Sequence, residues 1–478
     1  MRTFRTLLVC AIGACFVMAA HAQSFERADG KKLNAISVDT IVERLMKAAE
    51  VTGLELAIVN KNKLVYAKSY GYKNTAAQTL NDTATCFYAA SLSKSLFAFL
   101  VMQLVDEKII DLDKPVYTYL PKPLPEYADY KDLAGDERWK LITGRHCLSH
   151  TTGLPNWRQF NPRGNKKLEI FFTPGERYAY SGEGIFLLQM VIETITGKKL
   201  EEIAREKIFN PLGMTRTSYI WQPSFETNYA VGHSVSEVPF QKSKRSSANA
   251  AGSMETTAAD YARFVASVMG GKNISKASLA EMLRPQVYIN QKRQFPSLNT
   301  DTTSANRKFG LAYGLGWGLL QLPQGKAFFK EGHGDGWQNY VICFPEKQMA
   351  FLFLANSDNA ESIYKELVER IVGVSIPWEW ESYIPYLPFV QLPQEQMQQF
   401  VGTYDGRLKA IITLENGRLK IASPTVKLPP TNMYATNDHQ FFLKIMDVKM
   451  DFRKNAEGKF DKVIVEDEGE RYELTRQP

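Results

Sequence analysis

The sequence predicts an α+β domain followed by a small all-β domain. Apolar segments typical of strands lie near both ends of the first 375 residues, and helical patterns lie between them. Beyond residue 393 the pattern changes to short alternating segments separated by turns that contain glycine. When strands at both ends of a domain enclose helices, one sheet commonly joins the two ends. We therefore expect such a sheet in the first domain and a barrel in the second.

Each main segment of the first domain has a helical or a strand pattern. Two alternating segments around Asn60-Lys61-Asn62 predict a β-hairpin over residues 54–72. Further strands are predicted over 339–345 and 349–356, helices over 38–50, 89–104, 184–196, 200–208, 258–269 and 361–372, and a loop over 121–140.

A linker rich in proline and aromatic residues separates the two domains. Residues 376–393 contain four prolines, and the strand pattern begins after them. Asn416-Gly417 then lies between two alternating runs, which is a strong hairpin signal. The predicted boundaries are 1–22 for a leader, 23–375 for the first domain, 376–393 for the linker and 394–478 for the barrel.

Residues 1–22 have the pattern of an export signal. Arg2 and Arg5 precede an apolar run, and Ala20-His21-Ala22 forms a cleavage pattern. We expect cleavage after Ala22 and a periplasmic or secreted protein. A lipoprotein processed at Cys15 is the less favoured alternative, because the apolar run continues beyond that residue. No later segment is apolar over the roughly 20 residues that a membrane span requires.

The composition is that of a folded protein without a nucleic-acid site. Hydrophobic residues make up 44% of the chain and charged residues 23%, with a formal net charge of +7. The basic segment Lys242–Arg245 is too short for nucleic-acid binding and is expected to be a solvated loop. Cys86, Cys147 and Cys343 do not have metal-ligand spacing, and a disulfide among them remains open.

The segment "ASLSKS" contains the first candidate for chemistry. On a helix, the spacing of Ser91 and Lys94 places the hydroxyl and the amine on one face, one turn apart. An amine can activate such a serine for attack on a carbonyl, and the amide groups at a helix start can hold an oxyanion. Alternatively, the serine is only a helix N-cap. The chain contains a second serine–lysine pair with this spacing, Ser362 and Lys365, which lacks downstream partners and is expected to be structural.

Two later segments supply candidate partners for Ser91. Tyr180 lies on a loop beside glycine, just before an apolar helix, and would need nearby cations such as Lys94 to lower its pKa before it could act as a base. The segment His333-Gly334-Asp335-Gly336 begins a predicted strand, where small residues let backbone amides approach a substrate. Taken alone, an aromatic residue beside glycine is more often a packing residue, and a lone histidine beside glycines is weak evidence. The order of the two segments after Ser91 strengthens the second.

Several blocks, in this order, resemble the serine β-lactamase-like superfamily, in the branch of class C β-lactamases, D-Ala-D-Ala carboxypeptidases, D-aminopeptidases and esterases. They are "ASLSKS", "LSHTTGLP", "TPGERYAYSGEG", "NPLGM", "YGLGW" and "GHGDGW". The resemblance covers residues 35–372 and implies an antiparallel sheet flanked by helices plus a helical subdomain. The segment from "FVGTYDG" onward resembles the lipocalin-like domain of many exported members.

The resemblance also implies roles for individual residues. Ser91 would be the nucleophile, Lys94 its proton-handling partner and Tyr180 the general base. The amides of Ser91 and Gly336 would form the oxyanion hole, and His333 would take the place of the cation in the strand motif.

Two residues depart from the family pattern, and two further histidines belong to its scaffold. Gly182 stands where an asparagine is usual, and Asp335 where a glycine is usual. His146 and His150 are expected to be structural.

The leading hypothesis is an exported serine hydrolase that forms an acyl-enzyme on Ser91. Peptide amides, including those of D-amino acids, or esters are favoured over β-lactams, because a histidine is only partly charged at neutral pH and binds a carboxylate less well than a permanent cation. A true β-lactamase and a non-catalytic binding or sensing protein are the alternatives. No metal or cofactor is needed, and the β domain could cover the cleft or contact another subunit of a homo-oligomer.

Overall fold

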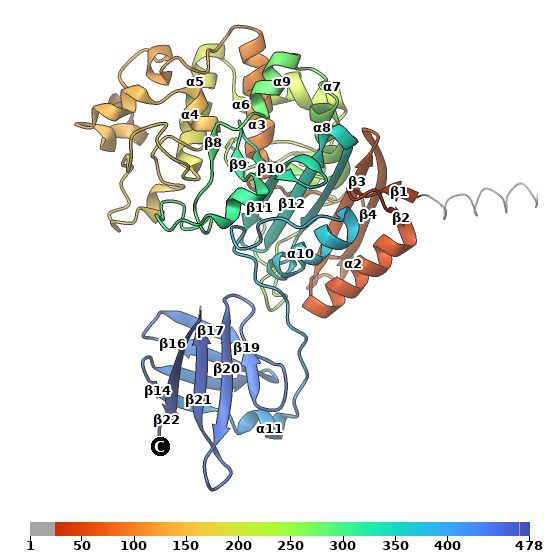
Figure 1. Cartoon of the computed structure of the whole chain (residues 1–478), viewed down its shortest axis with the longest axis vertical. Coiled ribbons are helices and arrows are strands. Elements are labelled where there is room, and N and C mark those ends of the chain that lie inside the picture. The colour runs from red at the N-terminus through yellow and green to blue at the C-terminus, as the bar shows by residue number, and fades with distance from the viewer. Residues whose placement is uncertain (1–23, 468) are drawn as a thin grey trace, which may run out of the picture.

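The computed structural model describes residues 24–467 and 469–478, which form two units joined by a linker (Figure 1). The predicted leader lies outside the described residues. No described helix is long and apolar enough to cross a membrane. The first unit has the expected α+β architecture, and the second is a nine-stranded antiparallel sheet.

A nine-stranded antiparallel sheet forms the centre of the first unit, in the order β5-β4-β3-β13-β12-β11-β10-β9-β8. β3 pairs with β13, so the sheet joins the two ends of the domain as predicted. β3 and β4 form the predicted hairpin. The strands are β3 (Gly53–Asn60), β4 (Lys63–Asn74), β5 (Thr79–Leu80), β8 (Val287–Tyr288), β9 (Ala312–Tyr313), β10 (Gly318–Leu322), β11 (Gly325–Gly334), β12 (Trp337–Phe344) and β13 (Met349–Ala355).

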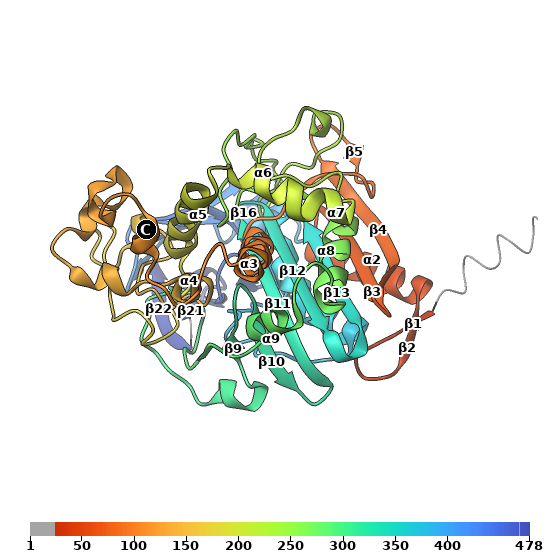
Figure 2. The same ribbon diagram turned by 90° about the horizontal axis from the view of Figure 1, so that it is seen from above.

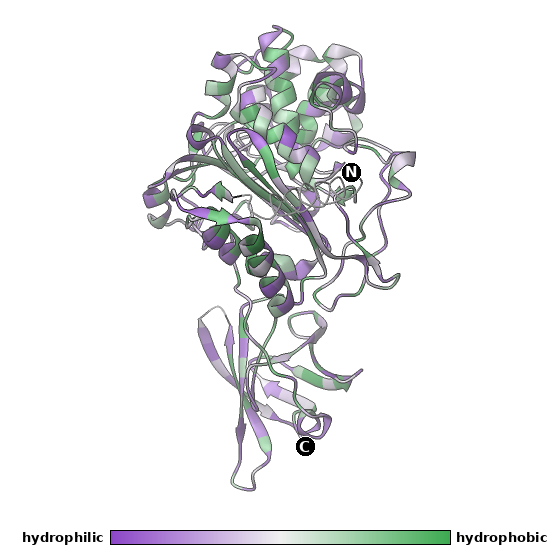
Figure 3. Ribbon diagram, turned by 90° about the vertical axis from the view of Figure 1, so that its right-hand side faces the viewer, coloured by the Kyte–Doolittle hydropathy of each residue, from purple (hydrophilic) through white to green (hydrophobic). Residues whose placement is uncertain are grey.

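Helices cover both faces of this sheet. The helices are α2 (Ala35–Ala49), α3 (Leu92–Asp106), α4 (Gly144–Leu148), α5 (Gly182–Thr196), α6 (Leu200–Ala204), α7 (Asn210–Leu212), α8 (Ala258–Met269), α9 (Lys276–Met282) and α10 (Tyr364–Leu367). Two short sheets complete the unit, β1 (Ser24–Glu26) with β2 (Lys32–Asn34) and β6 (Phe87–Tyr88) with β7 (Glu255–Thr256). Figure 3 shows α2 on the side of the sheet opposite to most of the other helices.

The two faces of the sheet bury separate apolar cores, which explains the continuous apolar run of β13. Leu352 and Leu354 face the core shared with α3, α5 and α8, whereas Phe351 and Phe353 face the core shared with α2 and α10. Successive side chains of a strand point to opposite faces, so a strand covered on both sides is apolar throughout.

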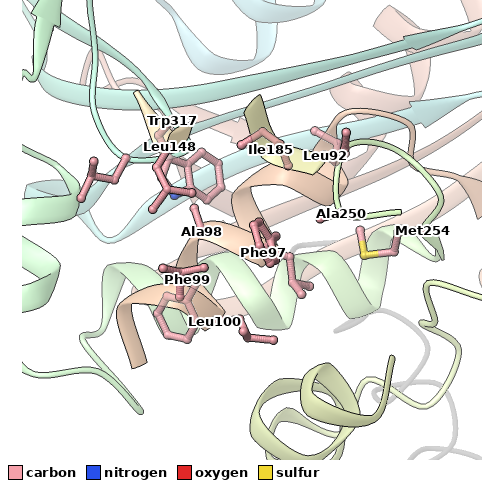
Figure 4. Close-up of a cluster of buried hydrophobic side chains, with 14 of the residues drawn as sticks. Leu92, Phe97, Ala98, Phe99, Leu100, Leu148, Ile185, Ala250, Met254 and Trp317 are labelled. Carbon is pink, nitrogen blue, oxygen red and sulfur yellow. The ribbon is translucent and has the colours of Figure 1, made fainter. Parts of the chain in front are cut away.

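α3 runs through the middle of the domain and is buried on all sides. Figure 2 shows it surrounded by α5, α8 and the sheet, and Figure 4 shows its apolar side chains in contact with those neighbours. The rings of Phe99 on α3 and Phe264 on α8 meet edge to face at 5.5 Å. A helix with apolar residues all round is a core helix, and here its first turn opens on the cleft described below.

Two expectations about the first unit need correction, and the open question of a disulfide is answered. The predicted loop over residues 121–140 contains three short 3₁₀ helices, at Leu124–Glu126, Ala128–Leu133 and Glu137–Leu141. The predicted closing helix consists of a 3₁₀ turn, α10 and a π-helical turn at Val368–Val372. Cys86, Cys147 and Cys343 are all buried free thiols, so none of them forms a disulfide.

The second unit begins with α11 (Gln394–Gln398) and continues as a nearly closed antiparallel barrel. Its first and last strands in the sheet, β17 and β18, follow each other directly in the chain. Asn416 and Gly417 both have positive φ and connect β15 to β16, as the hairpin signal predicted. The strands are β14 (Gly402–Gly406), β15 (Ala410–Glu415), β16 (Arg418–Ser423), β17 (Leu428–Asn432), β18 (Tyr434–Ala435), β19 (Gln440–Phe442), β20 (Val448–Lys454), β21 (Phe460–Asp467) and β22 (Glu470–Arg476).

Polar contacts join the barrel to the end of α2. The carboxylate of Glu50, which follows α2, accepts hydrogen bonds from Lys444 at 2.6 Å and from Arg418 at 3.3 Å. The side chain of Asn432 donates to the hydroxyl of Ser236 at 2.6 Å. The barrel therefore packs on the α2 side of the first unit.

Candidate active site

Ser91 and Lys94 lie one turn apart at the start of α3. The Nζ atom of Lys94 donates a hydrogen bond of 2.9 Å to the Oγ atom of Ser91 and one of 2.5 Å to the carbonyl oxygen of Ala251. Ser91 is the N-cap residue of α3, but its side chain makes no capping hydrogen bond. Its hydroxyl is therefore engaged with the lysine and not with the helix.

The backbone that leads into Ser91 is strained. Ala90 has a φ of +47°, a conformation that residues with a side chain rarely adopt. Strain of this kind persists where the surrounding structure requires it, and it clusters at functional sites. Here it turns the chain from β6 into α3. The turn places both the hydroxyl and the amide of Ser91 at the positive end of the helix dipole.

The environment of Lys94 favours a neutral amine. Its side chain is almost fully buried, and the burial, together with the nearby ammonium of Lys330, lowers the pKa of Lys94 well below that of an ordinary lysine. A neutral amine in hydrogen-bond contact with Ser91 can accept the hydroxyl proton. Lys94 is thus suited to act as a base.

Tyr180 lies beside both lysines, just before α5. The ammonium nitrogen of Lys94 is 5.0 Å from the centre of its ring, and that of Lys330 is 4.8 Å from it. Burial raises the pKa of Tyr180 above that of an exposed tyrosine, and Lys330 and Ser91 offset part of the increase. The expectation that Lys94 would lower this pKa needs correction: Lys330 is the cation that does so, and the net direction is upward. At neutral pH the hydroxyl keeps its proton.

Lys330 on β11 was not among the expected site residues. It is fully buried, and its Nζ atom donates to Oε1 of Glu331 at 2.7 Å and to the Glu331 carbonyl at 3.1 Å. Burial opposes the charge on Lys330, but Glu331 raises its pKa, so the lysine is charged. The strand thus brings a permanent cation to Tyr180, at the place where the sequence suggested a histidine.

Gly332 lies directly against Ser91. A Cβ atom at this position would be 2.6 Å from the carbonyl oxygen of Ala89 and 3.3 Å from the amide nitrogen of Ser91. Such a short contact with backbone leaves no room for a side chain. Only glycine lets β11 approach the start of α3 this closely.

The amide of His333 is the second candidate oxyanion donor, beside the amide of Ser91. β10 pairs with β11 only as far as Phe329, so no described strand flanks that edge of β11 beyond this residue. Asp335 and Gly336 form the two-residue turn between β11 and β12. Residues of an antiparallel pair alternate in the direction of their backbone groups, so His333 directs its N–H toward the free edge, next to Gly332 and Ser91.

Gly336 does not lie at the nucleophile, which corrects the expected oxyanion hole. Its amide donates a hydrogen bond of 2.7 Å to Asp358, and a Cβ atom there would meet the backbone of His233. Asp335 is exposed at the same turn and adds no carboxylate to the hole. Gly334 packs against the ring of Tyr88. The part of the strand that lies against Ser91 is three residues earlier, at Lys330-Glu331-Gly332-His333.

Trp157 fills the space that an asparagine would occupy at position 182. A Cβ atom on Gly182 would lie 2.7 Å from the Trp157 ring and 2.9 Å from the carbonyl oxygen of Asn156. The side-chain oxygen of Asn156 accepts from the Gly182 amide at 3.1 Å. The Trp157 ring therefore leaves room only for glycine at position 182.

These residues line one cleft of about 440 Å³, which runs along the free edge of β11. Ser91 lies opposite Gly332 and lines this cleft. Its walls are formed by Tyr88, Ser91, Lys94, Asn156, Trp157, Phe160, Tyr180, Arg245, Asn249, Ala251, Gly252, Phe295, Glu331 and His333. All of these side chains belong to the first unit, so the barrel does not contribute to the cleft as the structure describes it.

The family model described as Beta-lactamase matches residues 38–372. The chain belongs to the beta-lactamase family. Penicillin-binding protein 4* of Bacillus subtilis is 23% identical over 91% of the chain and 97% of its own length. The D-alanyl-D-alanine-carboxypeptidase/endopeptidase AmpH of Escherichia coli is 23% identical over 67% of the chain and 83% of its own length. The solved octameric penicillin-binding protein homologue of Pyrococcus abyssi matches with a TM-score of 0.58 at 19% identity, over 93% of the chain and all of its own.

Other residues of this beta-lactamase-family chain have structural roles. The Nδ1 atom of His150 accepts from the amide of Ser181, and its ring lies 4.2 Å from that of Tyr180, so it positions the tyrosine loop. His146 completes a capping box at α4. Ser362 donates to the carbonyl of Asn359 at 2.7 Å and does not line the cleft. Among the described residues, no group of three or more His, Cys, Asp or Glu side chains could hold a metal ion.

The basic segment Lys242–Arg245 is a loop in which Ser243 and Lys244 are exposed as expected, whereas Lys242 and Arg245 pack against the protein. Lys242 pairs with the buried Glu255 at 2.7 Å. The guanidinium of Arg245 stacks on the ring of Tyr88 at 3.9 Å and lines the cleft. In this beta-lactamase-family fold Arg245 is therefore the residue of the segment that contributes to the wall of the cleft.

A signal for Lys330 was present in the sequence. "KEG" fits a lysine-x-glycine strand motif just as "HGD" approximates a histidine-x-glycine motif three residues later. The sequence alone does not decide between these two neighbouring matches. The position of the hairpin turn decides between them, because it determines which glycine faces Ser91.

Proposed function

We propose that this protein is a serine hydrolase that cleaves peptide amides or esters through an acyl-enzyme on Ser91. The observation that carries the proposal is the 2.9 Å hydrogen bond between Lys94 Nζ and a Ser91 hydroxyl that takes no part in helix capping. Membership of the beta-lactamase family supports the same chemistry. The names of relatives, which include a D-alanyl-D-alanine carboxypeptidase, make peptides of D-amino acids the first substrates to test.

The first half of the reaction forms the acyl-enzyme. The Ser91 Oγ atom attacks the substrate carbonyl carbon while its proton moves to the neutral Lys94 amine. The amides of Ser91 and His333 hold the negative charge that develops on the carbonyl oxygen. The bond to the leaving group then breaks, and the leaving nitrogen or oxygen takes the proton of the Tyr180 hydroxyl. The proton on Lys94 restores Tyr180.

The second half releases the acyl group. A water molecule attacks the ester carbonyl, its proton passes to the tyrosine and lysine pair, and the Ser91 oxygen is reprotonated as it leaves. This scheme differs from the expected one in the resting state of Tyr180. Because burial raises its pKa, the tyrosine begins as an acid, and Lys94 is the first base.

A steady-state assay with a p-nitrophenyl ester and a D-amino-acid amide tests the proposal. Ser91→Ala should abolish hydrolysis of both, whereas Ser362→Ala should leave it unchanged. The second variant is a matched control, because Ser362 has the same spacing to a lysine but does not line the cleft. Hydrolysis that survives in Ser91→Ala would contradict the assignment. If the native protein also fails to turn over either compound, it is the binding or sensing protein considered above.

The proposal also includes export of the protein, and it leaves the oligomeric state to be measured. We infer that the chain is exported and cleaved after Ala22, because of its leader pattern; N-terminal sequencing of protein purified from the host envelope or medium tests this. The Pyrococcus abyssi homologue is octameric, so the mass of the purified protein in solution is the measurement for oligomeric state.

A further inference from the structure

The two ends of the cleft differ in charge. Along β11, Glu331 lies on one side of Gly332, and Gly334, packed on Tyr88, lies on the other. Arg245 stacks on Tyr88, so it belongs to the second end. Ser91 lies between them, opposite Gly332. A substrate that extends along the free edge of β11 therefore meets the Lys330–Glu331 ion pair on one side of Ser91 and the guanidinium of Arg245 on the other.

The end of the cleft that contains Glu331 is where a leaving group would lie. In the proposed reaction Tyr180 protonates the leaving atom, so that atom must come close to the tyrosine hydroxyl. Tyr180 contacts Lys330, and Lys330 is paired with Glu331. The acyl part of the substrate then extends in the other direction, toward Tyr88 and Arg245.

Glu331 lines this end of the cleft, and one of its carboxylate oxygens has no partner in the described part of the chain. Its Oε1 atom accepts from Lys330 at 2.7 Å and from Gln294 at 2.8 Å. Its Oε2 atom is buried with no hydrogen-bond partner among the described residues, and the residue is only 3% exposed. A buried acceptor without a partner carries a desolvation penalty that a ligand N–H or ammonium group would relieve.

Glu331 also cancels the charge of Lys330. Burial alone would raise the pKa of Glu331, but the Lys330 ammonium holds it below its usual range, so the carboxylate is ionised at neutral pH. The ion pair leaves this end without the net positive charge that attracts a substrate carboxylate. A carboxylate on the leaving group would add a second negative charge beside Glu331 in a poorly solvated site, where the single Lys330 ammonium can compensate only one of the two.

We propose that Glu331 selects acyl compounds whose leaving group carries an N–H donor or a positive charge and excludes those whose leaving group carries a carboxylate. This inference rests on the proposed function and names its substrate class. The preferred substrates are peptide amides and amine conjugates, and penicillins and free C-terminal dipeptides are poor ones.

The test compares two substrates that differ in one group. N-acetyl-D-alanyl-D-alanine ends in a carboxylate, and its C-terminal amide ends in a neutral donor. The native protein should show a kcat/KM at least about tenfold higher for the amide, since a like-charge contact exceeding about 1.4 kcal/mol corresponds to that factor. Glu331→Gln should reduce this ratio at least tenfold. Glu331→Thr, which also removes the charge, should do the same.

Glu381→Gln is the matched control. Glu381 is another buried carboxyl group that interacts with Glu331, but burial raises its pKa well above the usual range and it does not line the cleft. Because it is already neutral, its replacement should leave the ratio unchanged.

Three results would overturn the inference. The first is a native protein that prefers the free carboxylate, a result that needs no variant to fold. The second is a ratio that is the same in Glu331→Gln as in the native protein, with Ser91-dependent turnover intact. The third is no Ser91-dependent turnover of either compound, which would overturn the proposed function and this inference together.

Discussion

The ammonium nitrogen of Lys330 lies 4.8 Å from the centre of the Tyr180 ring. This contact connects the central sheet to the loop before α5, and Lys94 approaches the same ring from α3. A lysine with a depressed pKa and a lysine held charged by a carboxylate therefore share one tyrosine. This arrangement supports the proposed roles of Lys94 as the base, Tyr180 as the acid and Lys330 as the cation that stabilises the site.

The pH profile of hydrolysis should have an acid limb set by Lys94. The reaction needs its neutral amine, so kcat/KM rises as the pH increases through the pKa of Lys94 and then levels off. Burial and Lys330 lower that pKa well below the lysine value. Lys330→Met removes the positive charge that contributes to this lowering, so the pKa of Lys94 should rise. The acid limb should therefore move to higher pH. A limb that stays in place would show that Lys330 has no influence on Lys94.

Lys330→Met should also destabilise the fold. It leaves the buried carboxylate of Glu331 without its cation, which costs about 3–5 kcal/mol when a buried pair is broken from one side. Urea unfolding followed by tryptophan fluorescence measures the change. In the double variant Lys330→Met/Glu331→Gln the loss should be clearly smaller, since no uncompensated charge remains. Equal losses in the two variants would mean that packing of the lysine chain, and not its charge, stabilises the strand.

Gly332→Ala should abolish acylation. Its methyl group would lie 2.6 Å from the Ala89 carbonyl oxygen and 3.3 Å from the Ser91 amide, so either β11 or the start of α3 must shift. A displacement of this kind disrupts the oxyanion donors, and loss of one such donor alone costs roughly a hundredfold or more in kcat. The initial rate of ester hydrolysis checks this. In Gly144→Ala the new methyl group makes only ordinary contacts of 3.6 Å or more, so the rate should be preserved.

The effects of Gly182→Asn and Trp157→Ala on stability and turnover should be non-additive. Asparagine at position 182 would clash with the Trp157 ring, because a Cβ atom there already lies 2.7 Å from it. The single substitution should therefore lower both the melting temperature and the turnover. Adding Trp157→Ala opens the space and should recover at least part of each loss. A double-mutant cycle quantifies the coupling, and additive effects would argue against direct contact between the two positions.

Local periodicity was sufficient to predict much of the scaffold. The spacing of Ser91 and Lys94 is a helical one, so the sequence alone brings the hydroxyl and amine together. The alternating runs around Asn60-Lys61-Asn62 and Asn416-Gly417 predicted two hairpins that the structure contains. In each case the interacting residues are neighbours in sequence, and the chain geometry between them is nearly fixed.

The parts that were missed depend on contacts between distant segments. Whether Lys330 or His333 approaches Tyr180 depends on the register of β11 against β12, and one turn position decides it. Trp157 occupies the space beside Gly182 because a separate loop folds over α5. Arg245 reaches the cleft because it stacks on Tyr88. No short motif encodes these distances.

The most direct test of the account is to locate a covalent adduct. The protein is treated with a fluorophosphonate, digested and analysed by tandem mass spectrometry. We expect one adduct on Ser91, formed more slowly in Lys94→Ala and unaffected in Ser362→Ala. An adduct on another serine, or an unmodified Ser91 in the folded protein, would contradict the claim that this serine is an activated nucleophile.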